Sequence, residues 1–183
     1  RLDQGVIVAD YVVVAAGVAC AALLAPLGLA LPMLHRPGMI LRTRPVGARV
    51  GHILASPGQE VRQDLAGRLI APLAASHQGD AGDAVDLPGD LAEAALLRIR
   101  ALLPGVAMEL AEVAAAFRPV PGDGLPAVGA TGIAGLSLAV LHSGVTLAGI
   151  VAELLTAEIM GGDVSPMLDE FRPDRFFVTG FHA

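Results

Sequence analysis

The sequence contains no lysine, one cysteine and few charged side chains. Each of its 12 basic residues is arginine, and charged residues make up 16% of the 183 positions. The single cysteine, Cys20, excludes an internal disulfide framework and suits a reducing compartment, so we expect a cytoplasmic protein in which Cys20 is a small buried apolar residue. The formal net charge of −6 argues against the basic surface that nucleic-acid binding requires.

The histidines are too scattered to indicate a metal centre. His35, His52 and His77 lack the spacing of metal ligands, and no metal site is expected. His142 stands just before a predicted helix, where both a structural and a catalytic role remain open.

Two long uncharged runs raise the question of a membrane span. The run from Tyr11 to Leu34 is long enough to cross a bilayer. Pro26 and Pro32 break it, however, and a buried strand followed by a short packed helix produces the same pattern. The run from Leu125 to Ala152 is interrupted by glycines in the same way. We therefore expect no membrane span, and no signal-peptide pattern is evident.

The first predicted strand covers residues 11–16 and ends at Ala15-Ala16-Gly17. Open α/β sheets bind ligands just past the carboxyl ends of such strands, which makes Ala16 and Gly17 candidate contacts. A plain strand-to-helix turn that requires Gly17 is the alternative. A buried parallel strand needs neighbours on both sides, and the chain offers few. We expect a partner chain or a further N-terminal segment to supply them.

The middle of the chain is predicted to be an antiparallel meander. Its strands are expected over residues 31–45, 52–57 and 68–77, separated by glycine- and proline-containing turns. The polar stretch 79–89 is predicted to be an exposed loop. A helix is expected over residues 90–103, because Asp90 and Glu93 have the spacing of a capping box.

A strand over residues 109–118 follows this helix. Strict alternation would place Leu110, Glu112, Ala114, Ala116 and Arg118 on one face. Small alanines beside Arg118 would leave room next to its guanidinium, whose planar fork suits a carboxylate. The alternative is a surface arginine at the end of a strand.

The last long helix is predicted over residues 143–160. Leu147, Ile150, Val151, Leu154 and Leu155 repeat with helical spacing, and Gly161-Gly162 ends the helix. The first turn has little steric cover, so its free backbone N–H groups and the positive end of the helix dipole form a candidate anion site. An ordinary capped core helix is the alternative.

The chain lacks a dinucleotide-binding fingerprint. Residues 122–127 formally fit G-x-G-x-x-A, but Pro126 is badly placed for the helix that the motif requires. This segment is better explained as a tight turn between strands. The glycines at 129 and 132 have the wrong spacing.

Taken together, these motifs resemble the D-amino-acid oxidase superfamily of FAD-dependent oxidoreductases, which includes glycine oxidase, sarcosine oxidase and D-amino-acid dehydrogenases. The resembling segments are Arg118-Pro119, Asp123 to Pro126 with Gly129, His142 to Ala148, Phe171 to Phe176, and Ala9 to Gly17. The resemblance covers nearly the whole chain but only about the second half of a family member.

The resemblance implies an α/β (α+β) fold, made of the C-terminal part of a glutathione-reductase-like FAD domain and an antiparallel-sheet substrate domain. Residues 1–30 would be the last strand and helix of the FAD-binding domain. Residues 31–120 would be the substrate-binding sheet with its helix 90–103. Residues 121–183 would return to the FAD-binding domain and supply the flavin-facing helix 143–160.

The resemblance also implies an FAD-dependent amine or amino-acid oxidase or dehydrogenase. It would oxidise the C–N bond of an amino acid or secondary amine by hydride transfer to flavin N5. Arg118 would hold the substrate carboxylate, and no residue is predicted to be catalytic. The implied cofactor contacts are Ala16, Gly17, Gly144, Val145, Thr146 and Leu147. Arg42, Arg44 and Arg62 remain open between solvated sheet residues and further substrate contacts.

Two departures from relatives narrow this expectation. Sarcosine oxidase activates oxygen with a lysine, which this chain lacks, so a dehydrogenase or an oxidase of the glycine-oxidase type is expected. Cys20 lies in the wrong segment for flavin attachment, so the FAD should be non-covalent. Activity should need the N-terminal FAD-binding half, as a separate chain or a missing segment. The alternative is a non-catalytic subunit or fragment that pairs with a chain carrying that half.

Overall fold

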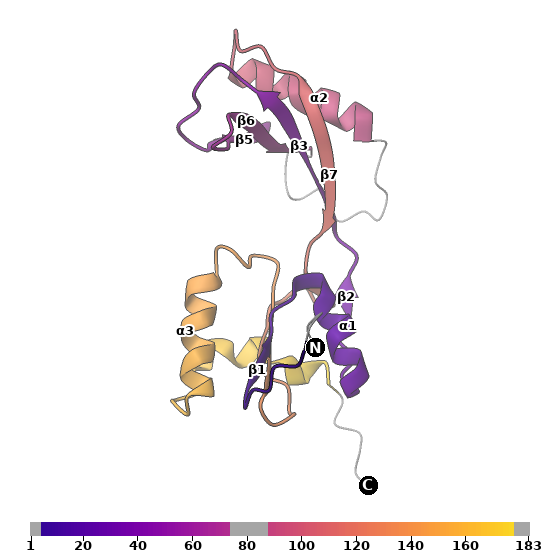
Figure 1. The fold of residues 1–183 in the computed structure, drawn as a ribbon, viewed down its shortest axis with the longest axis vertical. Helices are drawn as coiled ribbons and strands as arrows, with labels where there is room; N and C mark the ends of the chain where they lie inside the picture. Colours follow the sequence, from indigo (N-terminus) through magenta and orange to yellow (C-terminus); the bar gives the residue numbers. More distant parts are fainter. Residues whose placement is uncertain (1–4, 74–87, 178–183) are drawn as a thin grey trace. The chain divides into compact units, whose positions relative to one another are not determined.

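A computed structural model describes residues 5–73 and 88–177 of the chain. The chain divides into two compact units, shown in Figure 1. The first, here called the split unit, comprises the segment up to Leu34 and the segment from Arg118 onward. The second, the inserted unit, is His35–Phe117. The sequence predicts borders after residues 30 and 120, close to these positions.

The split unit contains a three-stranded sheet with the order β1-β10-β9. Its strands are β1 (Val12–Val14), β9 (Ala127–Ala130) and β10 (Leu136–Val140). β1 runs parallel to β10, and β9 runs antiparallel to it. A separate two-stranded ladder joins β2 (Met33–Leu34) to β8 (Val120–Pro121).

The helices of the split unit are short apart from α3. They are η1 (Gly17–Ala19), α1 (Cys20–Leu24), η2 (Ala25–Leu27), α3 (Ala148–Ile159), η4 (Pro166–Phe171) and η5 (Pro173–Arg175). Cys20 is fully buried and packs with Leu24 and Leu138, as predicted. Burial raises the pKa of its thiol above the ordinary value.

The predicted strand 11–16 is shorter in the structure and has one open edge. β1 spans only Val12–Val14, and among the described strands it pairs with β10 alone. Successive side chains of a strand point to opposite faces. Val12 and Val13 are nevertheless 49% and 42% exposed, so neither face of β1 is fully covered within the described residues.

The inserted unit is built on a five-stranded antiparallel sheet with the order β4-β5-β6-β3-β7. The strands are β3 (Pro37–Pro45), β4 (Leu54–Ser56), β5 (Gln59–Gln63), β6 (Arg68–Pro72) and β7 (Leu110–Phe117). The prediction of a meander is wrong in its order, because β3 lies between β6 and β7 rather than beside β4. The predicted strand 31–45 is divided into β2 and β3.

β5 is not predicted from the sequence, because four of its five residues are polar and only Val61 indicates a strand. Part of the predicted strand 68–77 and most of the predicted loop 79–89 fall outside the described residues. The helix expected over 90–103 is α2 (Pro88–Leu102). It begins two residues earlier than predicted, with a proline in its first turn, where the missing N–H is tolerated.

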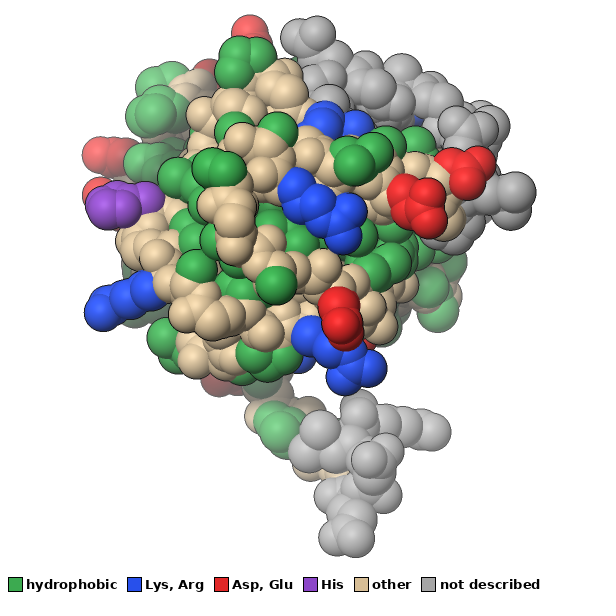
Figure 2. Space-filling model, turned by 90° about the horizontal axis from the view of Figure 1, so that it is seen from above, with side chains coloured by type: hydrophobic (Ala, Val, Ile, Leu, Met, Phe, Trp, Pro, Cys, Tyr) green, Lys and Arg blue, Asp and Glu red, His purple; other side chains and the backbone are tan. Residues whose placement is uncertain are grey.

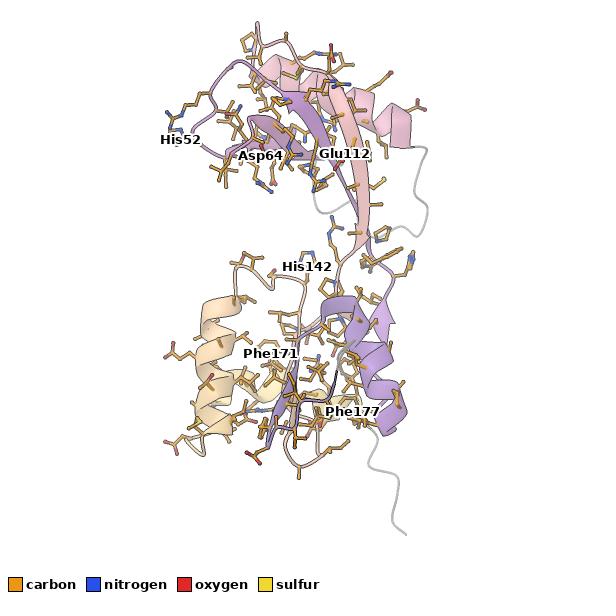
Figure 3. The ribbon with its side chains drawn as sticks, in the orientation of Figure 1. His52, Asp64, Glu112, His142, Phe171 and Phe177 are labelled. Atoms are coloured by element: carbon orange, nitrogen blue, oxygen red, sulfur yellow. The ribbon has the colours of Figure 1, made fainter. Side chains whose placement is uncertain are left out.

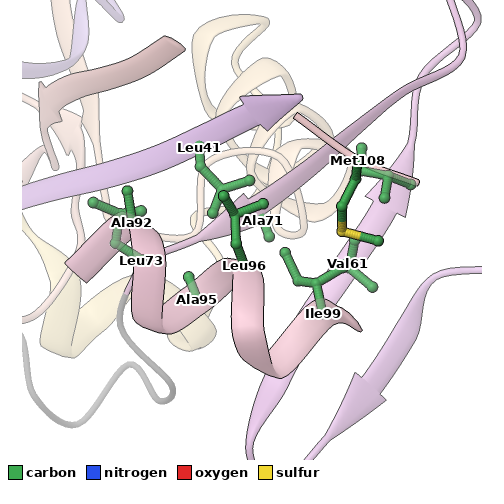
Figure 4. Packing of buried hydrophobic residues seen from close by; sticks show 10 residues of the cluster. Leu41, Val61, Ala71, Leu73, Ala92, Ala95, Leu96, Ile99 and Met108 are labelled. Carbon is green, nitrogen blue, oxygen red and sulfur yellow. The ribbon is translucent and has the colours of Figure 1, made fainter. Parts of the chain in front are cut away.

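α2 packs against one face of the sheet. Figure 4 shows Ala92, Ala95, Leu96 and Ile99 of α2 against side chains from the strands. The strand residues of this cluster include Leu41, Val61, Leu69 and Ala71, and all are almost completely buried. Because side chains alternate along a strand, their neighbours in sequence occupy the opposite face, which α2 does not cover.

A buried polar network also joins α2 to the sheet. Gln59 is fully buried, and its Nε2 donates to the carbonyl of Pro72 at 2.8 Å. Arg98 Nε donates to Gln59 Oε1 at 2.8 Å, and Arg98 Nη2 donates to the carbonyl of Leu73 at 2.7 Å. The network satisfies polar groups that would be costly to bury alone.

The surface has sparse, mixed charge. Figure 2 shows a face on which arginine and acidic side chains are dispersed among apolar ones. None of the helices in residues 5–73 and 88–177 combines the length and apolarity that a bilayer crossing requires.

Candidate functional site

The parallel pair β1 and β10 brings two predicted contact segments together. The register pairs Val14 with Leu138, so the chain leaves both strands at the same end of the sheet. It leaves β1 into Gly17 and leaves β10 into the turn that contains Gly144. This is the position at which open sheets bind ligands.

A groove of about 440 Å³ lies in the split unit and includes both glycines in its lining. Val13 and Ala15 contribute from the β1 segment, and Ala148 and Ala152 contribute from α3. Pro119 lies beside Gly17: a Cβ on that glycine would be 3.8 Å from the Pro119 Cβ. The lining is almost wholly apolar, which suits a flat aromatic ligand anchored by a few polar groups.

Gly17 has a backbone conformation that favours glycine. Its φ is +58°, in the left-handed region where a Cβ is unfavourable. The turn conformation alone therefore explains why residue 17 is glycine. Its place in the groove lining is a second reason for the absence of a side chain there. Ala16 immediately precedes it, is exposed and is absent from the groove lining.

The segment between β10 and α3 differs from the prediction. The helix begins at Ala148, five residues later than the predicted start at 143, and ends at Ile159. Residues 142–147 instead form consecutive turns. Leu147 N donates to the Ser143 carbonyl at 2.9 Å, so one isolated turn precedes the regular helix. No side chain caps the N-terminus of α3.

These turns leave three adjacent backbone donors open. Within residues 5–73 and 88–177, the N–H groups of Gly144, Val145 and Thr146 have no hydrogen-bond acceptor. All three residues are exposed. The Leu147 N–H already donates a hydrogen bond to the Ser143 carbonyl, unlike the N–H groups of the other three residues. Donors in this position, just before a helix N-terminus, favour an anion or a carbonyl oxygen.

Arg118 lies one residue beyond β7, at the start of the second segment of the split unit. It is half-buried, and the next residue, Pro119, lines the groove. β7 ends at Phe117, one residue before the predicted end of the strand, so alternation along β7 does not assign a face to Arg118. Alternation also fails near the strand start, because the register with β3 shifts between Glu112 and Leu110. Ala114 and Ala116 keep an unbroken register with Ile40 and Gly38 of β3 and so share one face of β7, and the room expected beside Arg118 stays a prediction.

An ionic clamp fixes the turn predicted over residues 122–127. Arg175 Nε donates to Asp123 Oδ2 at 2.6 Å, and Nη2 donates to Oδ1 at 3.1 Å. Arg175 Nη2 also donates to the Pro126 carbonyl at 2.8 Å. The hydrogen bonds from Arg175 hold the pKa of Asp123 below its ordinary value. Two segments of the family resemblance are thus joined directly, and the turn lies between β8 and β9 as predicted.

A second ion pair joins the C-terminal segment to α3. Arg172 pairs with Glu158, and both side chains are mostly buried. The Arg172 side chain crosses Gly129, whose φ is +130° and whose hypothetical Cβ would lie 2.6 Å from Arg172 Nη1. Gly129 is favoured by its positive φ, and a side chain there would also have to displace the end of the Arg172 side chain, which the spacing of the glycines alone did not reveal.

His142, labelled in Figure 3, is exposed and lies two residues after the end of β10. It lies two residues before Gly144, the first of the open donors, but it is absent from the groove lining. Among the described residues, no group of three histidine, cysteine or acidic side chains could hold a metal ion. Of the predicted site residues, the structure brings Gly17 and Gly144 into one groove, while Arg118 adjoins it in sequence through Pro119.

Comparison with known proteins identifies related folds. A family model described as FAD dependent oxidoreductase matches residues 1–158. Glycine oxidase from Geobacillus kaustophilus is 22% identical with a TM-score of 0.68, covering 94% of this chain and 47% of that chain. Iminodiacetate oxidase from Chelativorans sp. BNC1 is 23% identical with a TM-score of 0.66, covering 91% of this chain and 47% of that chain.

L-proline dehydrogenase from P. horikoshii is 18% identical with a TM-score of 0.69, covering 96% of this chain and 49% of that chain. The chain thus spans about half the length of the solved structures that it matches. A comparison with curated proteins returned no match. The family match confirms the resemblance, the fold class and FAD as the family's cofactor.

Proposed function

Because the chain belongs to the family of FAD-dependent oxidoreductases, we propose that it supplies the flavin-facing and substrate-facing part of an amine or amino-acid oxidase or dehydrogenase. It spans about half of its solved relatives. The complete activity would then require a nucleotide-binding half, on a partner chain or on a further segment. Its substrate would be an amino acid or a secondary amine.

One observation carries this proposal: Gly17 and Gly144 line the same apolar groove, and three open backbone donors begin at Gly144. The residues present fit a flavin. The groove is apolar enough for an aromatic ring system, and the donors suit the carbonyl oxygens along one edge of that system.

The chain's own groups would have distinct roles. The N–H groups of Gly144, Val145 and Thr146 would stabilise negative charge on the cofactor's pyrimidine edge. Leu147 would support them by closing the turn onto Ser143. Gly17, preceded by Ala16, would allow the backbone to approach the cofactor closely.

Substrate orientation is assigned to Arg118. Its guanidinium would hold a substrate carboxylate through paired charge-assisted hydrogen bonds, which fixes the carbon that reacts. This role rests on the family resemblance together with the position of Arg118 next to Pro119. When bound, FAD supplies the chemistry by accepting a hydride at N5 from the carbon that bears the amine.

Composition and burial support a proposal for how the cofactor is attached and for the type of electron acceptor. Cys20 is fully buried in the core, so we propose that FAD is held without a covalent bond. The absence of lysine from the sequence favours a dehydrogenase or an oxidase of the glycine-oxidase type. The single cysteine favours a reducing compartment such as the cytoplasm.

A second candidate is a non-catalytic subunit that pairs with a chain carrying the nucleotide-binding half. The open edge of β1 and the exposure of Val12 and Val13 favour such pairing. Both candidates predict a partner, but only the first predicts that bound flavin is reduced by an amine.

The test compares Gly144→Val with Gly149→Val in the flavin-loaded protein. A Cβ at either position meets no close contact, the nearest being 3.8 Å from the Leu141 carbonyl at Gly144. Only Gly144 lines the groove. The Gly144 variant should lose bound FAD, measured as free-flavin absorbance after denaturation, while the Gly149 variant should retain it. Equal retention in both variants would rule out this groove as the flavin site.

A further inference from the structure

The groove of the split unit has a floor and a wall that are held in different ways. Val13 of β1 and Ala139 of β10 belong to the floor, and backbone hydrogen bonds between the paired strands fix their separation. Ala148, Ala152 and Ile159 form part of the wall and come from α3, which lies beside β1 in Figure 1. Because no backbone ladder joins a helix to a sheet, side-chain contacts decide how far α3 stands from the floor.

The two ends of α3 are held by different kinds of contact. Near its start, Val151 and Leu154 pack against the apolar cluster that contains Leu141. Near its end, a polar contact joins it to the sheet, because Glu158 Oε1 accepts a hydrogen bond from the Ala130 N–H at 3.4 Å. Apolar packing has no preferred direction, whereas a hydrogen bond does. The contact at the C-terminal end is therefore the one that can define the orientation of α3.

Glu158 stands where an α-helix by itself disfavours a carboxylate. It is the next-to-last residue of α3, at the negative end of the helix dipole, and no basic residue in the last turn compensates it. Its charge is compensated instead by Arg172, whose Nη1 donates to Glu158 Oε2. The side chains of Glu158 and Arg172 are only 14% and 18% exposed. A contact outside the helix therefore explains the acid at this position.

The hydrogen bond to Glu158 comes from the row of strand residues that also carries a groove residue. Ala130 of β9 is paired with Ser137 of β10, and Ser137 is paired with Val13 of β1. Val13 lines the groove from the sheet, and Ile159, which follows Glu158, lines it from α3. The contact between Glu158 and Ala130 thus holds α3 at the level where both sides of the groove are formed.

Arg172 is held in place by its surroundings. Its carbonyl accepts a hydrogen bond from Arg175 Nη1 at 2.9 Å, and its guanidinium lies beside Gly129, which has no side chain. Within residues 5–73 and 88–177, however, Arg172 Nη2 is buried without a hydrogen-bond partner. An unpaired buried donor is costly, and a buried ion pair often adds no stability over apolar side chains of similar volume. A role in positioning explains this pair better than a role in stability.

We propose that Glu158 and Arg172 are positioning residues, whose buried ion pair fixes the C-terminal half of α3 against β9 and thereby sets the width of the groove. The consequence for the cofactor rests on the proposed function: the flavin ring meets a wall that is already in place, so binding does not have to order α3. The pair acts through α3, because neither side chain lines the groove.

The orientation of α3 is measured on the full chain without a ligand, by residual dipolar couplings of its backbone amides. The double variant Glu158→Leu/Arg172→Met replaces the pair by apolar side chains and should keep the denaturation midpoint of the parent chain. Its α3 couplings should no longer fit the orientation that fits β9 and β10. Glu153→Gln is the control, because Glu153 lies on α3, is exposed and is absent from the groove lining. It should leave the α3 couplings unchanged.

Binding of lumiflavin, the ring system without the dinucleotide, measures the consequence for the cofactor. The double variant should bind lumiflavin about 5-fold or more weakly than the parent chain, the equivalent of one lost hydrogen bond. The visible circular dichroism of the bound ring should also decrease at saturation. A role in stability alone would change neither quantity while the denaturation midpoint is unchanged. Glu153→Gln should bind lumiflavin like the parent chain.

Unchanged α3 couplings in the double variant would overturn the proposal. Changed couplings with unchanged lumiflavin affinity would also overturn it, because the groove would then not depend on the pair. If the parent chain does not bind lumiflavin at the groove, the proposed function fails, and the couplings still decide whether the pair positions α3. If the double variant does not fold, Glu158→Gln, which keeps an acceptor for the Ala130 N–H, decides by the same couplings.

Discussion

At the scale of single residues, glycine and arginine are the most informative. Gly17 and Gly129 were suspected from motifs, but their physical reasons differ. Gly17 needs a left-handed backbone, whereas Gly129 must also leave space for Arg172. The sequence could predict that these positions matter, but it could not identify the neighbours that exclude a side chain there. The sequence does not decide the role of Arg62 for the same reason, because its partners among the described residues depend on distant chain segments.

The backbone requirement at Gly17 predicts a stability effect. Gly17→Ala places a Cβ in the left-handed region and should lower the free energy of unfolding by about 1–2 kcal/mol. Gly47→Ala is the control, because Gly47 has no left-handed φ and no atom within 4 Å of its hypothetical Cβ. It should change stability by less than about 0.5 kcal/mol. Denaturant unfolding of both variants measures this, and equal losses would contradict the assignment.

The clamp between Asp123 and Arg175 predicts a pH dependence. The folded pKa of Asp123 is lowered, so its contribution is present above the unfolded pKa and is lost as pH falls through the folded value. Thermal unfolding should therefore shift to lower temperature as pH falls below about 4. Asp123→Asn should flatten this dependence and lower the melting temperature at pH 7.

The pH dependence should not vanish in Asp123→Asn. Hydrogen bonding to the backbone and side chain of Arg68 also lowers the pKa of Asp64, which is unchanged in the variant. A variant with the same pH slope as the parent protein would show that Asp123 is not held in this ion pair.

At the scale of elements, local sequence patterns predict which helices and strands exist better than they predict the order of the strands in a sheet. α2, α3 and the apolar strands were expected, since their side chains repeat with helical or strand periods. β5 was missed because polar Gln59 is buried through contacts with Arg98 and Pro72, which no local pattern reveals. The position of β3 between β6 and β7 likewise depends on pairing between distant segments. The late start of α3 reflects the separate turn closed by Leu147.

The network between α2 and the sheet can be tested through Gln59. Gln59→Leu removes the acceptor for Arg98 Nε and the donor for the Pro72 carbonyl. It should cost about 1–3 kcal/mol of stability for each group left unsatisfied. Leu97→Ala is the control, because Leu97 lies on α2 but is 64% exposed. Denaturant unfolding should show a loss for Gln59→Leu well beyond that of the control, and similar losses would mean that the network contributes little.

At the scale of the whole molecule, the resemblance implies domain borders after residues 30 and 120, and the structure divides after Leu34 and after Phe117. The family was recognisable from short motifs spread over the chain, and the family match confirms it. The groove could not be predicted, because it needs β1, β10 and α3 together. The roles of Arg118 and of the turn before α3 remain predictions that this groove supports.

The central claim is that the open N–H groups before α3 receive the flavin ring at the groove of the split unit. The most direct measurement is an NMR titration of the full chain with lumiflavin, which carries the ring system without the dinucleotide. The amide signals of Gly144, Val145, Thr146 and Gly17 should shift together with a single dissociation constant, while Leu147 N–H should keep its hydrogen bond. Shifts confined to other parts of the chain, or no saturable shift at these amides, would contradict the account.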